Sequence, residues 1–181
     1  MTVAAGNNGE RDKDLGFDRI QVPADSVNAL TVGASDRTTS EWARANYSAR
    51  GPGRSPGRRK PDVLAFGGSG SEYFHVAVSD VAPRIAPNLG TSFASPLALR
   101  SAAGVSAFLG DDVHPLTIKA LLIHSCEARD GLHPHDIGWG LVPSDLTEII
   151  TCGEGVARII YQGKLNPGKY LRAPVPCLPT K

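Results

Sequence analysis

Short apolar runs separated by longer polar segments dominate the first part of the chain. Three of these runs fall within residues 2–5, 29–34 and 62–65, and they are almost continuous rather than alternating. Strands covered on both faces have this pattern, whereas strands with one solvated face alternate between polar and apolar residues. We therefore expect three short buried strands of an α/β fold, three-layered around a mainly parallel sheet.

The pattern becomes helical after residue 91. Small and apolar residues run from Ser92 to Phe108, and the glycine at position 110 is a suitable C-terminal cap, so a helix is expected over about 92–108. Asp112 or His114 precedes a second helix over 115–124, because proline is favoured in the first turn. Its buried face is expected at positions 118, 121 and 122.

The remaining segments give weaker signals. Residues 73–78 are a possible strand, and 79–89, with proline and small polar residues, reads as a turn-rich connection. Ser144 is expected to cap a short helix that ends at Ile150. Beyond 153, the runs 155–163 and 169–175 are separated by the turn sequence Asn166-Pro167-Gly168, which predicts a β hairpin.

Composition excludes several classes of protein. The 181 residues include 41% hydrophobic residues and carry 19 basic against 18 acidic side chains, which suits one domain with a core and argues against a nucleic-acid-binding surface. A single basic run, residues 50–60, is interrupted by glycine and proline. We interpret it as a solvated loop, with a patch for an anionic partner as the alternative.

The chain shows no features of export or membrane insertion. No apolar run approaches about 18 residues, and no positively charged start precedes a hydrophobic stretch. Cys126, Cys152 and Cys177 are odd in number and widely spaced. Free thiols in a reducing compartment, with the cytoplasm favoured over export, are the simplest interpretation, and one disulfide remains open.

Candidate chemistry lies at the start of the first helix. Residues 90–96 read Gly-Thr-Ser-Phe-Ala-Ser-Pro, which is a glycine turn followed by hydroxyl and small residues that lead into the helix. A helix N-terminus carries unpaired N–H groups and a positive partial charge, so an oxygen nucleophile or an oxyanion at Ser92 would be stabilised there.

This stretch resembles the nucleophile motif Gly-Thr-Ser-x-Ala-[Ser/Thr]-Pro of the subtilisin-like serine proteases. Other segments agree with that family in the same order along the chain: Val3–Gly9 resembles the segment with the oxyanion-hole asparagine, Val22–Ala34 the segment after it, and Ser48–Pro52 and Lys60–Ala65 the segments before the serine. The resemblance covers residues 1 to 150 or so. Phe66 and Phe93 replace the proline and methionine that are usual there, and both changes are apolar.

The resemblance implies a role for each matching residue. Ser92 would be the nucleophile that forms the acyl-enzyme, and Asn7 would donate its amide to the oxyanion together with the Ser92 N–H. Asn7 is preferred to Asn8 because it follows Ala-Ala-Gly directly. Ala4, Ala5 and Gly6 would line the pocket for the substrate residue before the cleaved bond. No cofactor is implied, and no metal is assigned to the carbonyls of residues 24–29, which correspond to a weak cation site in some relatives.

The triad aspartate and histidine of the family precede the serine in sequence, and neither motif occurs before Ser92 here. His75 is the only histidine upstream, and it lacks the Gly-Thr context. His114, His124, His133 and His135 follow the serine, and a role as base would require another triad order. The close pair at 133 and 135 is interpreted as surface polar residues rather than as metal ligands.

We therefore expect residues 1–152 to be the C-terminal part of a subtilisin-like peptidase domain, incomplete on its N-terminal side, and residues 153–181 to begin a β extension. The expected partners are a polypeptide substrate, the N-terminal half of the domain, and a second copy bound through an exposed sheet edge. The chain alone is expected to be inactive. The alternatives are a non-catalytic binding or regulatory module with the protease scaffold and a subunit completed in trans by a separate N-terminal half.

Overall fold

Three parallel strands form the sheet on which the rest of the molecule packs. The computed structural model describes residues 1–53, 58–79 and 82–174. β1 (Thr2–Ala4), β2 (Leu30–Ser35) and β3 (Val63–Phe66) lie side by side in that order, with Ala4 opposite Val32 and Val32 opposite Val63. All six residues of β2 and the first three of β3 are buried, which confirms the prediction for these two strands, whereas the three residues of β1 are only partly buried.

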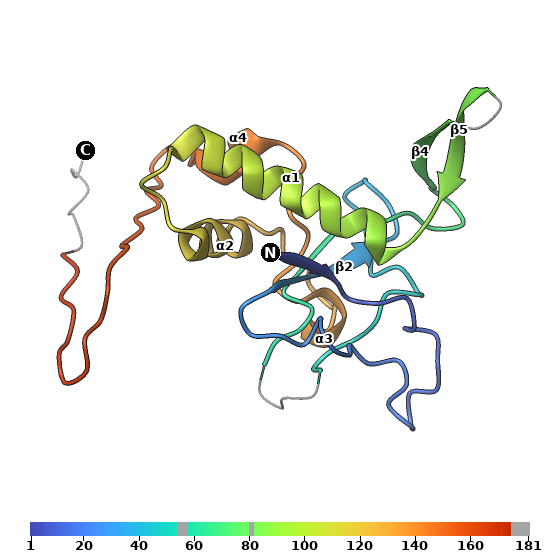
Figure 1. The fold of residues 1–181 in the computed structure, drawn as a ribbon, viewed down its shortest axis with the longest axis horizontal. Helices are drawn as coiled ribbons and strands as arrows, with labels where there is room; N and C mark the ends of the chain where they lie inside the picture. The colour runs from blue at the N-terminus through green and yellow to red at the C-terminus, as the bar shows by residue number, and fades with distance from the viewer. Residues whose placement is uncertain (54–57, 80–81, 175–181) are drawn as a thin grey trace.

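Helices cover the sheet on one face, and a short helix lies on the other. α1 (Thr91–Leu109) crosses the sheet, and α2 (Pro115–His124) and α4 (Leu146–Ile150) pack beside it (Figure 1). α3 (Pro134–Ile137) lies across the sheet from α1. The main core lies between β2, β3 and the three helices, and its buried members include Val32, Val63, Ala94, Ala98, Val105, Leu122 and Ile149. A second cluster, Trp42, Leu64 and Ile137, fills the opposite face.

The predicted helices agree with the structure, but one predicted connection is wrong. β4 (Phe74–Ser79) pairs antiparallel with β5 (Pro83–Asn88), which was expected to be a turn-rich connection. A two-stranded ribbon has only edge strands, so the missing N–H groups of Pro83 and Pro87 can face away from the partner strand. The hairpin projects from the end of the sheet that leads into α1 (Figure 1).

Two predictions near the C-terminus are also wrong. Asp145, and not Ser144, caps α4 by accepting a hydrogen bond of 2.8 Å from the Thr147 N–H. Residues 153–174 contain no strand, although the predicted turn forms, with a Lys169 N–H to Asn166 carbonyl hydrogen bond of 3.1 Å. Almost every residue of this segment is exposed. A hairpin without an apolar layer to cover is marginally stable in water, which explains the absence of pairing.

The basic run is only partly a solvated loop. Residues 54–57 lie outside the described residues, but the two ends of the run are tied into the fold. Arg50 is paired with Asp136 at 2.7 Å, and Lys60 is 3% exposed and paired with Asp62 at 2.6 Å. Burial lowers the pKa of Lys60, against the opposing effect of its bond to Asp62. The run therefore contributes structural ion pairs.

Two cysteines lie within the described residues, and neither forms a disulfide. Cys152 is exposed, and Cys126 is partly buried and donates to the Leu122 carbonyl at 3.1 Å. Burial raises the pKa of the Cys126 thiol to about 12, so this thiol is unreactive at neutral pH. Cys177 lies outside the described residues. Of the helices described, none is both long and apolar enough to cross a membrane.

Candidate active site

The N-terminus of α1 presents the candidate nucleophile at the surface. Gly90 is the N-cap residue, Thr91 begins the helix, and Ser92 follows as an exposed residue. Gly90 has a φ of +151°, and a Cβ built on it would lie 3.2 Å from the side-chain nitrogen of Asn7. Glycine is therefore required both by the backbone and by the close approach of Asn7.

Asn7 reaches the helix from the end of β1 through Thr91. Its Oδ1 accepts hydrogen bonds from the Thr91 N–H and from the Thr91 hydroxyl, both at 2.9 Å. The same hydroxyl accepts the Gly6 N–H at 3.2 Å. Thr91 is 1% exposed, whereas Gly6 is partly buried and Asn7 is exposed, so these contacts join the buried start of the helix to the surface. They bring Asn7 against the residue that directly precedes Ser92, from 84 positions away in sequence.

The two neighbouring asparagines make different contacts. The Oδ1 of Asn7 is held by two donors, and its amide nitrogen, which lies beside Gly90, has no acceptor among the described residues. Asn8 instead donates its amide to the carbonyls of Phe17, at 2.6 Å, and Arg19, at 2.9 Å. Asn8 therefore fixes the loop that follows β1, and only Asn7 retains a donor for a ligand.

Tyr47, which the sequence pattern does not single out, supports the turn before the nucleophile. Its hydroxyl lies 2.9 Å and 2.8 Å from the carbonyls of Gly67 and Gly68, and it accepts the Gly90 N–H at 3.0 Å. Burial raises the pKa of Tyr47 to about 12. Thr91 could have been found from its place in the nucleophile motif. Tyr47 lies in an aperiodic segment, and nothing local indicates its contacts.

The two unusual phenylalanines share one packing partner. Phe74 of β4 stacks on Phe66 with ring centroids 5.9 Å apart, and on Phe93 with centroids 5.1 Å apart. The stack joins the end of β3, the β4–β5 hairpin and the first turn of α1. Each phenylalanine therefore stabilises the position of the other, and aromatic pairs of this kind contribute about 0.5–1.5 kcal/mol beyond area burial.

The predicted pocket residues form the end of β1 and the turn after it. Ala5 is buried, at 3% exposure, and packs with Ile20, Ala24 and Ala49. Ala4 and Gly6 are partly exposed, and the Gly6 carbonyl accepts the Ala49 N–H at 2.9 Å. The methyl group of Ala5 thus belongs to the core. The surface next to Asn7 is therefore formed by the main chain of Ala5 and by its neighbours Ala4 and Gly6.

No base accompanies the serine within the part of the chain that the structure describes. The Ser92 hydroxyl has no hydrogen-bond partner there, and no histidine reaches it. His75 is exposed on β4, His114 caps α2, and His133 caps α3. Burial, together with the neighbouring His133 and arginines, lowers the pKa of His135.

The described residues contain no group of three His, Cys, Asp or Glu side chains that could hold a metal ion. In the segment that corresponds to a cation site in some relatives, the Lys119 ammonium donates to the carbonyls of Ala29, at 2.9 Å, and Val27, at 3.3 Å. The Lys119 side chain thus already binds two of these carbonyls.

The sequence profile of the Subtilase family matches residues 1–140, which is most of the chain and includes every element that forms this site. The chain belongs to the subtilase family. No curated protein matches the sequence. The subtilase assignment confirms the family and the α/β fold with its parallel sheet that the motifs implied.

Solved structures with the same fold include three proteases. The prenylagaramide maturation protease PagA is 21% identical, with a TM-score of 0.59 over 82% of this chain and 48% of that chain. The epidermin leader peptide processing protease from Staphylococcus aureus is 20% identical, with a TM-score of 0.63 over 87% and 41% of the two chains. Fervidolysin from Fervidobacterium pennivorans, a keratinolytic enzyme, is 23% identical, with a TM-score of 0.63 over 84% and 22%. This subtilase chain spans less than half of each.

Proposed function

We propose that this chain is the nucleophile-bearing part of a subtilisin-like serine endopeptidase, and that the complete enzyme hydrolyses peptide bonds through an acyl-enzyme on Ser92. The Ser92 oxygen adds to the substrate carbonyl and gives up its proton to the triad histidine, and the tetrahedral intermediate collapses with loss of the peptide C–N bond as the histidine protonates the leaving amine. Water, deprotonated by the same histidine, then attacks the acyl-enzyme and releases the acid with return of the proton to Ser92. The amide of Asn7 and the Ser92 N–H bind the oxyanion in both steps. Ala4, Ala5 and Gly6 contribute the adjoining wall of the substrate pocket.

The contact of Asn7 with Thr91 carries this proposal. An oxyanion hole requires a fixed donor that is not already satisfied, and the Asn7 side chain is held by its oxygen with its nitrogen left available. Ser92 is exposed beside it at a helix N-terminus, where developing negative charge is favoured.

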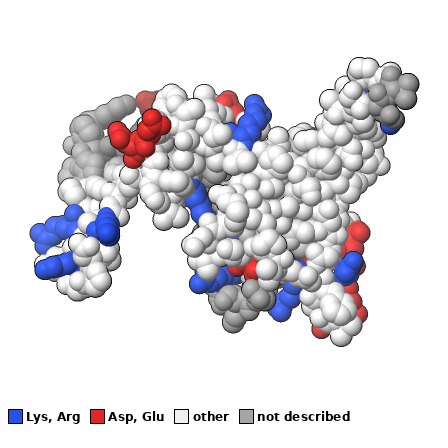
Figure 2. Space-filling model, in the orientation of Figure 1, with Lys and Arg blue, Asp and Glu red and all other residues white. Residues whose placement is uncertain are grey.

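The triad aspartate and histidine are proposed to come from polypeptide outside residues 1–181, bound at the outer edge of β1. In the sheet order β1-β2-β3, this edge has no partner strand among the described residues. Beside it, a cavity of about 150 Å³ is lined by apolar residues that include Leu30, Leu99 and Leu116. The surface over α1 and the start of the chain is largely uncharged (Figure 2). A parallel strand followed by apolar residues suits such an edge, and a second copy of the chain could compete for it.

The test compares the chain alone with the chain produced together with the preceding part of its reading frame. Both are treated with a fluorophosphonate probe and with unstructured casein, and Ser92→Ala is the matched control. We expect labelling and hydrolysis only in the longer protein, and loss of both in the Ser92→Ala variant. An unlabelled longer protein that is folded would favour the non-catalytic module, and activity of the chain alone that Ser92→Ala abolishes would refute the need for outside residues.

A further inference from the structure

A cavity on the far edge of the sheet belongs to none of the chemistry above. It measures about 240 Å³ and lies between the end of β3, the middle of α1, and the segment that leads into α4. A space of this volume holds several water molecules, so a ligand of dipeptide size can enter it.

The hydrogen-bonded edge of β3 stops at this cavity. Leu64 donates to the Gly140 carbonyl at 2.8 Å and accepts the Val142 N–H at 2.9 Å. Alternate residues of a strand face the same edge, so the N–H and C=O of Phe66 also face outward. Neither has a partner there among the described residues, because the ladder ends where Pro143 follows Val142. Phe66 therefore offers one donor and one acceptor to a peptide group.

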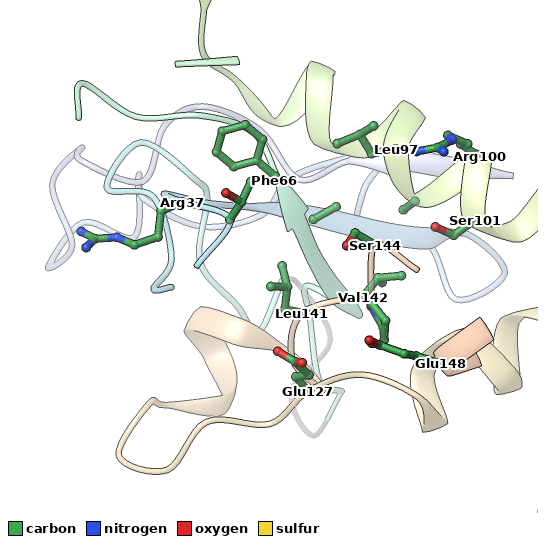
Figure 3. A pocket seen from close by; sticks show the side chains of 14 residues that line it. Arg37, Phe66, Leu97, Arg100, Ser101, Glu127, Leu141, Val142, Ser144 and Glu148 are labelled. Carbon is green, nitrogen blue, oxygen red and sulfur yellow. The ribbon is translucent and has the colours of Figure 1, made fainter. Parts of the chain in front are cut away.

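Charges of opposite sign stand on opposite sides of an apolar floor. Figure 3 shows Glu127 and Glu148 below Leu141 and Val142, with Arg100 and Leu97 on α1 above them. Arg100, Glu127 and Glu148 have no ionic partner among the described residues. Arg37, which also lines the cavity, is already paired with Asp36 at 3.0 Å. The groups without an ionic partner are thus one exposed guanidinium on the α1 side and two exposed carboxylates on the other side.

We propose that this cavity binds a short peptide with both termini free, best a dipeptide with an aliphatic side chain. The carboxylate of the ligand pairs with Arg100, its ammonium group with Glu127 and Glu148, and its peptide group with the main chain of Phe66. The aliphatic side chain packs on Leu97, Leu141 and Val142. A free amino acid matches the charges but lacks the peptide group, and an internal peptide segment lacks the charges.

The test titrates leucyl-alanine into the 181-residue chain with Ser92→Ala, so that no hydrolysis can occur, and follows binding by calorimetry. Free leucine, N-acetyl-leucyl-alanine and leucyl-alanine amide are the comparison ligands. Arg100→Gln and Glu148→Gln are compared with Arg11→Gln and Glu10→Gln, which remove the same charges outside the cavity. Exposed ion pairs are worth about 0.2–1 kcal/mol, so each cavity substitution should weaken the binding of leucyl-alanine by a factor of roughly 1.4 to five.

The matched pairs make the result specific. Leucyl-alanine amide has no carboxylate to pair with Arg100, so Arg100→Gln should not weaken its binding further. N-acetyl-leucyl-alanine has no ammonium group to pair with Glu148, so Glu148→Gln should weaken its binding less than that of leucyl-alanine. The two control substitutions should leave binding unchanged, and free leucine should bind more weakly than leucyl-alanine. Equal binding of capped and uncapped peptides, equal effects of the cavity and control substitutions, or no binding of leucyl-alanine would each overturn the proposal.

Discussion

Replacing Thr91 with valine should show how much the hydroxyl group of Thr91, as distinct from the packing of its side chain, contributes to stability. Valine preserves the buried shape but removes the donor to Asn7 Oδ1 and the acceptor of the Gly6 N–H. A typical hydrogen bond contributes about 1 kcal/mol, and an unsatisfied buried donor costs about 1–3 kcal/mol. Gly6 is only partly buried, so we expect a total loss near the lower end, about 2 kcal/mol.

Urea unfolding followed by tryptophan fluorescence measures this loss, because Trp42 is 2% exposed in the native state. With an m-value of about 2 kcal/mol per molar urea, the midpoint should fall by about 1 M. Ser92→Ala removes the adjacent hydroxyl, which is exposed and unpartnered, and should change the free energy of unfolding by less than about 0.5 kcal/mol. Thr91→Ser keeps the hydroxyl and loses one methyl group, at about 0.8 kcal/mol.

The order of the three variants in free energy of unfolding distinguishes hydrogen bonding from packing at position 91. The hydroxyl network requires Thr91→Val to be the least stable, Thr91→Ser to be intermediate, and Ser92→Ala to resemble the wild-type chain. If Thr91→Ser were less stable than Thr91→Val, packing rather than hydrogen bonding would fix this position, and the argument that Asn7 is oriented through Thr91 would fail.

Three further predictions concern the framework. Lys60→Met should lower the free energy of unfolding by about 3–5 kcal/mol in urea titrations, because it leaves the buried Asp62 carboxylate without its nearest cation. The double variant Lys60→Met with Asp62→Leu should recover part of this loss of stability. A loss below about 1 kcal/mol in Lys60→Met would contradict the prediction. The pKa of Tyr47 is raised from 10.0 to about 12 on folding, so its contribution to the free energy of unfolding is complete below pH 10 and is lost as the pH rises towards 12. Urea midpoints measured across this pH range should therefore fall less in Tyr47→Phe than in the wild-type chain. An unchanged pH profile would refute this prediction. Deleting residues 163–181 should change the free energy of unfolding by less than about 0.5 kcal/mol in urea titrations, because residues 163–174 are exposed. A larger change would show that the segment packs against the domain.

The sequence predicted the buried strands and the two long helices well because their signals are local. Continuous apolar runs placed β2 and β3 within one residue, and Pro115 fixed the start of α2. The β4–β5 hairpin was missed in part because its prolines argue against a strand unless the strand is known to be an edge. The C-terminal strands failed for the opposite reason, since favourable local propensity found no surface to pair with.

The candidate site was predictable as far as its motif extends. Ser92 and Asn7 were identified from residue pattern and family resemblance, and the structure brings Asn7 against Thr91. The support from Tyr47 depends on a contact across 43 positions with no local signature. Lys60 carried a misleading signal, because its basic neighbours suggested a solvated loop while a single partner, Asp62, two residues away, made burial possible.

The most direct test of the account is the turnover of the complete peptidase domain with Asn7→Ala against Asn8→Ala. Removal of one oxyanion-hole donor lowers kcat by about 10²–10³ in subtilisin, a member of this family, and we expect a loss of the same order for Asn7→Ala with little change in KM. Asn8→Ala should lower stability and leave kcat within about three-fold, since its amide binds only the Phe17 and Arg19 carbonyls. Equal kcat losses in the two variants, or an Asn7→Ala variant as fast as the wild-type domain, would contradict the assignment of this site.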